Sequence, residues 1–246
     1  MPALRLESVR SSAGWNVRKL LVSLFLFSGL MLSVRWSFLA PYFVTTVSME
    51  PTLFPGDLLM VHKASYRIWI PFTHVEVGNQ TPIARGDIVV FRYPNDLQSE
   101  YVKRVVAIAG DRLQVRRHSV ILNGVTVPQE SILILPDGST FRRETFGEAL
   151  HFLQYSLISE SENGAGMWSP DTEYIVPPES VFVMGDHRDA STDSREWGHV
   201  PVSYVRGKVI SLLWKQTRPT NLKFFDKMEE GHFFQKVDPE RGNTNP

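Results

Sequence analysis

Cysteine is absent from this sequence. Its absence excludes disulfide bonds, zinc sites built on thiolates and catalysis by a thiol. The seven histidines include no His-x-x-x-His pair or similar ligand spacing, which argues against a zinc hydrolase. We therefore predict no metal site and no cofactor.

An excess of charge is also lacking, because 26 Lys and Arg balance 26 Asp and Glu. Without a broad basic field, nucleic acid is not an expected partner. No internal repeat and no second apolar run of membrane-spanning length occurs. At 246 residues the chain can bury one substantial core, or it can combine a membrane anchor with one composite domain.

One charge-free apolar run is present, from Leu20 to Val34, and it resumes after Arg35 as far as Val44. The charge-free part alone is too short for a hydrocarbon core about 30 Å thick. Arg35 is therefore expected near an interface, where its long stem can reach the headgroups. We predict a single transmembrane anchor at residues 20–41.

The charges on either side of this run predict its direction. Residues 41–61 contain no Lys or Arg, whereas four basic residues precede the run: Arg5, Arg10, Arg18 and Lys19. By the positive-inside rule, residues 1–19 are cytoplasmic and the remainder lies across the membrane. A cleaved secretory signal is the alternative, although no Ala-x-Ala site follows the run.

The remainder of the chain is predicted to be mainly β. Short runs rich in Val, Ile and Phe alternate with Gly, Pro, Asn and Asp, and Asn123-Gly124 predicts a hairpin. The expected strands are Asp57–His62, Gly86–Arg92, Val102–Ala109, Asp111–Arg116, Ser119–Leu122, Ser180–Met184 and Lys208–Trp214. We assign residues 42–127 and 179–215 to one β-rich domain, with residues 128–178 as a more polar, irregular inserted subdomain. Residues 216–246 are expected to be a loosely packed tail.

Two residues of this domain could carry hydrolytic chemistry without a histidine. Ser48 follows the apolar run, and Lys103 lies in an expected strand beside Val102, Val105 and Val106. Burial against apolar neighbours favours the neutral amine and can lower a lysine pKa from about 10.4 to roughly 7–8. A neutral amine can then deprotonate a serine. Taken singly, each residue also fits a plain structural role, in a turn or on a solvated strand face.

Four segments occur in an informative order after the predicted anchor. They are residues 46–53 (TVSMEPTL), 85–91 (RGDIVVF), 101–106 (YVKRVV) with Gly110-Asp111, and 185–195 (GDHRDASTDSR) with Trp197-Gly198. In this order and spacing they resemble bacterial type I signal peptidase, a family of Ser/Lys serine proteases that remove signal peptides from exported proteins. The resemblance covers about residues 15–214.

This resemblance implies a role for several residues. Ser48 corresponds to the nucleophile and Lys103 to the general base. The backbone amide of Ser48 and the hydroxyl of Thr46 correspond to the oxyanion donors. Ser191 corresponds to the serine that orients the lysine amine. Residues Asp193 and Arg195 correspond to a supporting ion pair, and the apolar substrate pockets correspond to Tyr42, Val44, Met49, Leu53, Val90, Tyr101 and Val102.

The family also implies a substrate and a location. Cleavage is expected after small residues at −1 and −3 of a preprotein signal peptide. The chain would pass once through the inner (cytoplasmic) membrane, with its catalytic domain on the periplasmic or extracellular side and the secretion translocon nearby. The bilayer and the signal peptide are then its expected partners.

The sequence departs from the family at four positions. His187 and Ala190 replace asparagines, while Ala107 and Ala109 replace a frequent glycine and proline. A calcium loop beginning at Asp189 is excluded, because the positions that need glycine and glutamate hold Ser194 and Val200. Two alternatives stay open: a processing peptidase of the same clan that matures pilin or conjugation proteins, and a catalytically silent membrane-anchored scaffold.

Overall fold

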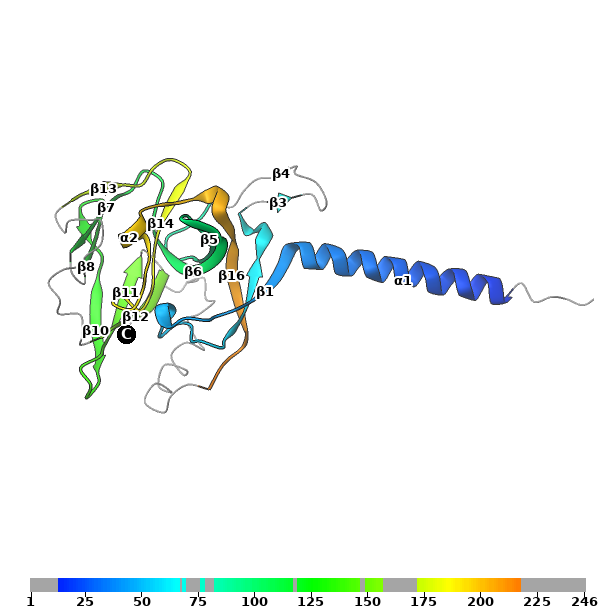
Figure 1. Cartoon of the computed structure of the whole chain (residues 1–246), viewed down its shortest axis with the longest axis horizontal. Helices are drawn as coiled ribbons and strands as arrows, with labels where there is room; N and C mark the ends of the chain where they lie inside the picture. The colour runs from blue at the N-terminus through cyan, green and yellow to red at the C-terminus, as the bar shows by residue number, and fades with distance from the viewer. Residues whose placement is uncertain are drawn as a thin grey trace, which may run out of the picture. The chain divides into compact units, whose positions relative to one another are not determined.

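The computed structural model describes residues 13–66, 68–69, 76–77, 82–116, 119–146, 149–156 and 172–217. The chain divides into two units, residues 1–38 and 39–246 (Figure 1). In the first unit the structure describes α1 (Ala13–Phe38). Within the described residues, no helix combines the length and the apolar character needed to cross a membrane. The predicted anchor at residues 20–41 is therefore not confirmed, and strand β1 begins at Leu39, before its predicted end.

The second unit is mainly β, as predicted. Its main sheet has seven strands, in the order β1-β2-β16-β5-β6-β14-β15, and every neighbouring pair is antiparallel. These strands are β1 (Leu39–Phe43), β2 (Leu58–His62), β5 (Ile88–Tyr93), β6 (Asp96–Ile108), β14 (Ser180–Met184), β15 (Val200–Pro201) and β16 (Val205–Trp214).

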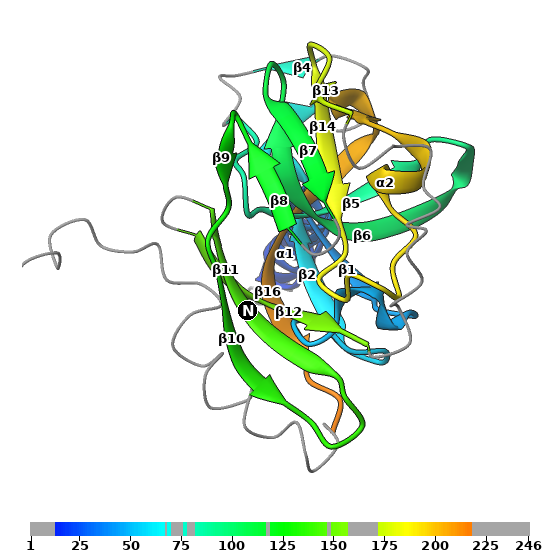
Figure 2. The same ribbon diagram turned by 90° about the vertical axis from the view of Figure 1, so that its left-hand side faces the viewer.

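Three smaller sheets accompany the main one, ordered β13-β7-β8-β9, β10-β11-β12 and β3-β4. The first two appear one above the other in Figure 2. Their strands are β3 (Ile68–Trp69), β4 (Glu76–Val77), β7 (Arg112–Arg116), β8 (Ser119–Leu122), β9 (Val125–Thr126), β10 (Gln129–Ile134), β11 (Thr140–Phe146), β12 (Ala149–Tyr155) and β13 (Tyr174–Ile175). Short helical turns are η1 (Val47–Met49), η2 (Lys63–Ser65), η4 (Val202–Tyr204) and α2 (Ser194–Trp197).

The central strands are those with the longest apolar runs. All five residues of β14 are buried, and so are the first four of β5. A strand covered on both faces needs apolar residues at successive positions, not at alternate ones. This explains why Ile88–Phe91 and Val181–Met184 are read correctly as strands from sequence alone.

The Asn123-Gly124 hairpin is confirmed. It joins β8 to β9, with φ of 54° at Asn123 and 81° at Gly124. Two consecutive residues with positive φ are characteristic of a type I′ turn, whose twist matches that of the flanking strands. Asn and Gly tolerate this conformation at little cost.

Residues 128–178 are more regular than predicted, because β10, β11 and β12 form an antiparallel sheet. The sequence pattern is misleading here, since strand β11 carries consecutive charges at Arg142, Arg143 and Glu144. Glu144 nevertheless has no exposed surface. A charge is buried in this way only when partners from elsewhere in the fold neutralise it, and sequence periodicity does not reveal such partners. Residues 157–171 lie outside the described part of the chain.

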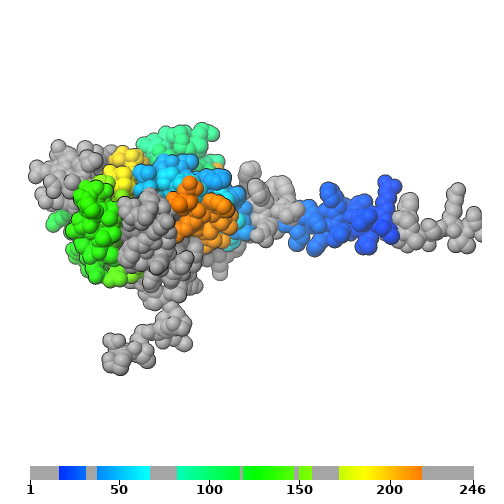
Figure 3. Space-filling view, turned by 90° about the horizontal axis from the view of Figure 1, so that it is seen from below, coloured from blue at the N-terminus to red at the C-terminus, as the bar shows by residue number. Residues whose placement is uncertain are grey.

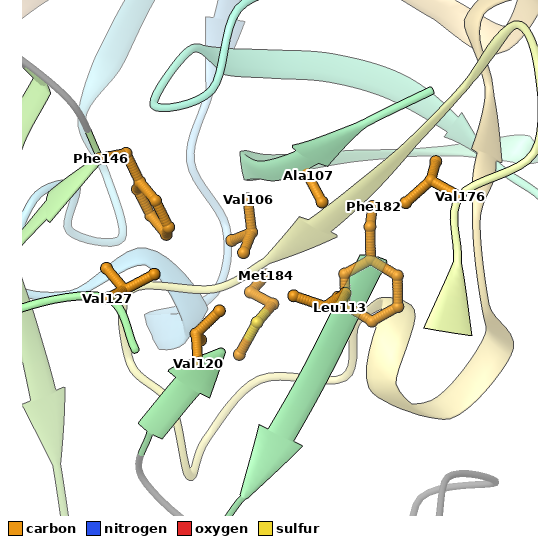
Figure 4. Packing of buried hydrophobic residues seen from close by; sticks show 9 residues of the cluster. All are labelled: Val106, Ala107, Leu113, Val120, Val127, Phe146, Val176, Phe182 and Met184. Atoms are coloured by element: carbon orange, nitrogen blue, oxygen red, sulfur yellow. The ribbon is translucent and has the colours of Figure 1, made fainter. Parts of the chain in front are cut away.

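The buried apolar residues form several clusters. Figure 4 shows one of them, in which β6 and β14 pack against the strands of the four-stranded sheet. Leu113 of β7 and Val120 of β8 meet Phe182 and Met184 of β14 there. This packing supports the faces of the two strands that flank the candidate site.

The end of β16 lies against the segment that follows Ser48. The backbone N–H of Gln216 donates to the Asp57 carboxylate at 2.8 Å, and the two segments share one face in Figure 3. Residues 218–246, which include most of the tail predicted to pack loosely, lie outside the described residues.

Candidate active site

Ser48 lies in the single helical turn η1, which follows the extended residue Thr46 and precedes residues buried in an apolar cluster. Thr46, directly before this turn, is extended, with φ −128° and ψ 158°. The residues that follow, Met49 and Leu53, are fully buried in an apolar cluster and are joined by a backbone hydrogen bond of 2.9 Å. The turn therefore holds the Ser48 hydroxyl in place, with 6% of the residue exposed.

Lys103 reaches Ser48 from β6. Its Nζ is hydrogen-bonded to Ser48 Oγ, and only 3% of the residue is exposed. Burial lowers its pKa from 10.5 to about 8, although the Asp193 and Asp186 carboxylates oppose the shift. A lowered pKa is the expected net result, because desolvation disfavours the ammonium form of Lys103. The two carboxylates stabilise that form only weakly, since each is itself paired with an arginine.

Thr46 completes a second contact at Ser48. Its Oγ1 lies 3.1 Å from Ser48 Oγ, and the residue is exposed. A hydroxyl on an exposed residue beside a buried nucleophile can donate to an oxygen of an incoming carbonyl. Ser48, Lys103 and Thr46, chosen from sequence, are thus brought together by the fold.

Ser191 has a different partner from the one that the resemblance implies. Its hydroxyl donates to Asp193 Oδ2 at 2.7 Å, and in the described part of the chain no hydrogen bond joins it to Lys103. Asp193 also accepts the backbone N–H of Gly185 at 2.8 Å and pairs with Arg195 at 2.8 Å. A carboxylate with several donors holds the surrounding loop rigidly.

Gly185 is a residue to which sequence reasoning gave no role. A Cβ at this position would lie 2.2 Å from Ser191 Oγ and 2.4 Å from the backbone oxygen of Ser48. Only glycine allows the loop to approach the nucleophile so closely. The signal in the sequence is its place at the end of a buried strand, directly before the polar run DHRD.

Arg104 and Asp186 form a second unforeseen feature beside the site. The guanidinium makes two hydrogen bonds to the carboxylate, at 2.8 and 2.6 Å, and both residues are buried. The Thr52 hydroxyl also donates to Asp186. This fork fixes the strand that carries Lys103 to the loop that carries Ser191. In the sequence, the only sign of this ion pair is that Arg104 follows Lys103 and that Asp186 lies in the same motif as Ser191.

Six of the seven predicted pocket residues meet in one apolar cluster. Val44, Met49, Leu53 and Val90 are buried there, with Tyr42 and Val102 packed against them. The seventh, Tyr101, belongs to another cluster and stacks on Tyr93 at 4.8 Å between ring centroids. It remains near the site, since Lys103 Nζ lies 5.8 Å from its ring centroid.

Among the described residues, no group of three or more His, Cys, Asp or Glu side chains is arranged to hold a metal ion. Three side chains of the site are in contact: Lys103, Ser48 and Thr46. A buried amine that can be neutral touches a buried hydroxyl, and the hydroxyl of the exposed Thr46 lies 3.1 Å from that hydroxyl. This arrangement can transfer a proton from serine to lysine and stabilise a negative oxygen nearby.

Several known proteins are similar to this chain. A signal peptidase I of Pseudomonas fluorescens is 31% identical over 212 residues, covering 81% of this chain and 74% of the relative. One from Pseudomonas aeruginosa is also 31% identical, with the same coverage. A signal peptidase I of Aquifex aeolicus is 27% identical, covering 83% of this chain and 87% of the relative. A crystal structure of a signal peptidase I from Enterococcus faecalis aligns with a TM-score of 0.33 at 20% identity, covering 52% of this chain and 97% of that chain.

The family model described as signal peptidase, peptidase S26, matches residues 17–214. That range includes most of α1 and the whole described β unit up to Trp214. The chain therefore belongs to the signal peptidase family of serine endopeptidases, peptidase S26.

Proposed function

We propose that this protein is a membrane-anchored endopeptidase that cleaves signal peptides from exported preproteins, with Ser48 as nucleophile and Lys103 as general base. The observation that carries the proposal is the contact between Lys103 Nζ and Ser48 Oγ inside a buried, apolar environment. A lysine on a solvated strand face would not have its pKa lowered to about 8.

The reaction follows from this contact. The neutral amine of Lys103 takes the proton of Ser48 Oγ as that oxygen bonds to the scissile carbonyl carbon. The resulting oxyanion accepts hydrogen bonds from the Thr46 hydroxyl and the backbone N–H of Ser48. The C–N bond then breaks, and the ammonium gives its proton to the leaving amine. Lys103 next takes a proton from a water, whose oxygen bonds to the ester carbonyl carbon. The bond between that carbon and Ser48 Oγ then breaks, and the ammonium returns its proton to Ser48 Oγ.

The apolar cluster beside Ser48 supports a specificity for small side chains. An extended substrate can add as a strand near the segments that carry Ser48 and Lys103, so that alternate side chains enter the protein. The cluster residues there, including Val44, Met49 and Val90, are already almost fully buried. A large side chain at −1 or −3 would have to displace close-packed atoms, and a charged one would be desolvated.

We test this with the detergent-solubilised full chain and preproteins that differ only at −1. Alanine at −1 and −3 should give one cut, whereas phenylalanine at −1 should abolish it. Ser48→Ala should be inactive and Ser203→Ala, an exposed serine on η4, should cleave normally. Cleavage by Ser48→Ala would refute the assigned nucleophile. Efficient processing with phenylalanine at −1 would refute the pocket alone.

The location is proposed on the charge pattern of the sequence. A single span of the inner membrane would begin near residue 20 and end before strand β1 at Leu39, with residues 1–19 cytoplasmic and the catalytic domain across the membrane, close to the translocon. Carbonate extraction and protease digestion of intact cells or vesicles test this. Release of the chain by carbonate, or digestion of the β unit from the cytoplasmic side, would contradict it.

A further inference from the structure

The three-stranded sheet β10-β11-β12 has no role in the reaction proposed above, yet it contacts the loop of residues 185–193, here called the catalytic loop. We propose that this sheet positions the catalytic loop, with Glu144 as a positioning residue that acts through Arg188. The inference rests on the proposed function for its consequence in catalysis, and on contacts alone for its structural part.

The end of β12 pairs with the catalytic loop through backbone hydrogen bonds. Gln154 donates to the Asp186 carbonyl at 2.9 Å, and Arg188 donates to the Gln154 carbonyl at 3.0 Å. Two residues after Gln154, the N–H of Ser156 donates to the Asp189 carboxylate at 2.9 Å. The loop is thus joined to β12 by a single parallel β-bridge between Gln154 and His187.

One side chain from each strand of the sheet takes part in a buried network that ends at Arg188 of the loop. Glu144 on β11 has no exposed surface, and its carboxylate binds Arg188 of the loop. Gln129 on β10 donates to the same carboxylate at 2.6 Å, and His151 on β12 lies 3.0 Å from it. A buried carboxylate needs several donors of this kind, and here they fix the position of one loop arginine.

The loop transmits this support to the reacting groups. The backbone N–H of His187 donates to the Ser48 carbonyl at 3.2 Å. The carbonyl of Arg188 accepts a hydrogen bond of 2.6 Å from Arg195, which pairs with Asp193. Phe54, shortly after Ser48, also packs against Phe141 and Phe152 of the sheet. Both the nucleophile turn and the catalytic loop are therefore attached to the inserted sheet.

The buried pair by itself does not require a functional explanation. Replacing a buried ion pair by apolar residues is often neutral or stabilising, so a merely structural role would affect stability alone. The position of this pair is the distinguishing fact, because one partner lies in the sheet and the other within the catalytic loop. Displacement of reacting groups by about 1 Å can cost about 100-fold in rate.

Glu144→Gln tests the proposal in the full-length chain. The variant keeps the size of the side chain and one oxygen for Arg188 while it removes the charge. Amide hydrogen exchange should accelerate in residues 185–191 and 47–49, and the remaining strands should exchange as in the wild type. Preprotein cleavage should lose about 10- to 100-fold in kcat, with KM unchanged, because the apolar cluster beside Ser48 is untouched.

Glu130→Gln is the matched control, since Glu130 lies on the same sheet but pairs with Arg143 at the surface. It should leave exchange and kcat unchanged. A folded Glu144→Gln protein with wild-type exchange in the loop would overturn the proposal. So would faster exchange spread evenly over the whole β unit with kcat per folded molecule unchanged, because that result describes a purely structural residue.

Gln129→Ala keeps the proposal testable if Glu144→Gln does not fold. It removes the amide of β10 that donates to the Glu144 carboxylate at 2.6 Å and leaves the charge pair of Glu144 with Arg188 in place. Exchange of residues 186–189 should accelerate, and unchanged exchange there would overturn the proposal. Hydrogen exchange needs no substrate, so it decides the positioning role even if the chain cleaves no preprotein.

Discussion

At the scale of single residues, opposing interactions set the charge of Lys103. Burial lowers its pKa, whereas Asp193 and Asp186 raise it and Arg195 lowers it further. The net result, a pKa of about 8, leaves a usable fraction of neutral amine near neutral pH. The fold achieves this by giving both carboxylates arginine partners of their own.

The first prediction concerns this amine. Because only the neutral form can accept a proton, kcat/KM should rise with pH and level off above about pH 8. Lys103→Arg should be inactive at every pH, since a guanidinium stays charged in proteins. The measurement is a pH profile of preprotein cleavage, with Lys208→Arg as a control that retains its charge opposite Asp87. A flat profile would contradict the assignment of the base.

The second prediction concerns the oxyanion. Thr46→Val keeps the shape of the side chain but removes the hydroxyl that lies 3.1 Å from Ser48 Oγ. It should lower kcat by about 10²- to 10³-fold, and Thr46→Ser should remain active. Thr45→Val, at an exposed neighbouring position, is the control. Normal cleavage by Thr46→Val would mean that backbone amides alone stabilise the oxyanion.

At the scale of elements, the site forms where η1, β6 and the catalytic loop converge. Each is held by a different kind of interaction: an apolar anchor at Met49 and Leu53, sheet pairing with β5 and β14, and a network of carboxylates. Close approach between the loop and η1 then depends on Gly185, where there is no room for a Cβ.

The third prediction follows from that contact. Gly185→Ala should lower kcat by about 100-fold or more, because the added methyl must push the catalytic loop away from Ser48. Gly124→Ala is the matched control: its Cβ would meet nothing within 4 Å, but φ is +81°. It should cost about 1 kcal/mol of stability without changing kcat. Steady-state kinetics combined with thermal melting separates the two effects, and equal kcat values in both variants would contradict the argument.

At the scale of the whole molecule, buried charges make stability depend on pH. Burial raises the pKa of Asp186, Asp193 and Glu144, but their arginine partners and hydrogen-bond donors outweigh it, so that all three pKa values are lowered, the last to about 2. In acid the unfolded chain therefore binds more protons than the folded one, which favours unfolding. For Lys103 the folded pKa is also the lower one, so its burial penalty is relieved as pH rises from about 8 towards 10.5.

The fourth prediction is the resulting stability profile. The free energy of unfolding should fall as pH drops from about 4.5 to about 2, because the buried carboxylates lose their arginine partners on protonation. It should rise between about pH 8 and 10.5 by an amount on the order of 3 kcal/mol from Lys103. Urea unfolding of the full chain across this range measures both limbs. An unfolding free energy that stays constant below pH 4.5 would contradict the first.

The amino-acid sequence by itself determined the β character of the second unit, the Asn123-Gly124 hairpin and the family. These properties are local, since strand periodicity, turn conformation and motif order each depend on neighbouring residues. Ser48 and Lys103 could be chosen as the candidate dyad from sequence because each lies within one of these local motifs. The prediction of irregular structure at 128–178 missed strands β10, β11 and β12. The alternation of apolar and polar residues there is obscured by charges whose partners are distant in sequence.

Tertiary structure alone decided which groups meet. Ser48 and Lys103 are 55 positions apart, and their contact depends on the pairing of β6 and on the anchor beneath η1. The same holds for Glu144 and Arg188, and for the space that excludes a Cβ at Gly185. The free energy of a buried charge or a close backbone approach depends on everything that surrounds it. Those surroundings come from segments far apart in the chain, so they exist only once the chain has folded.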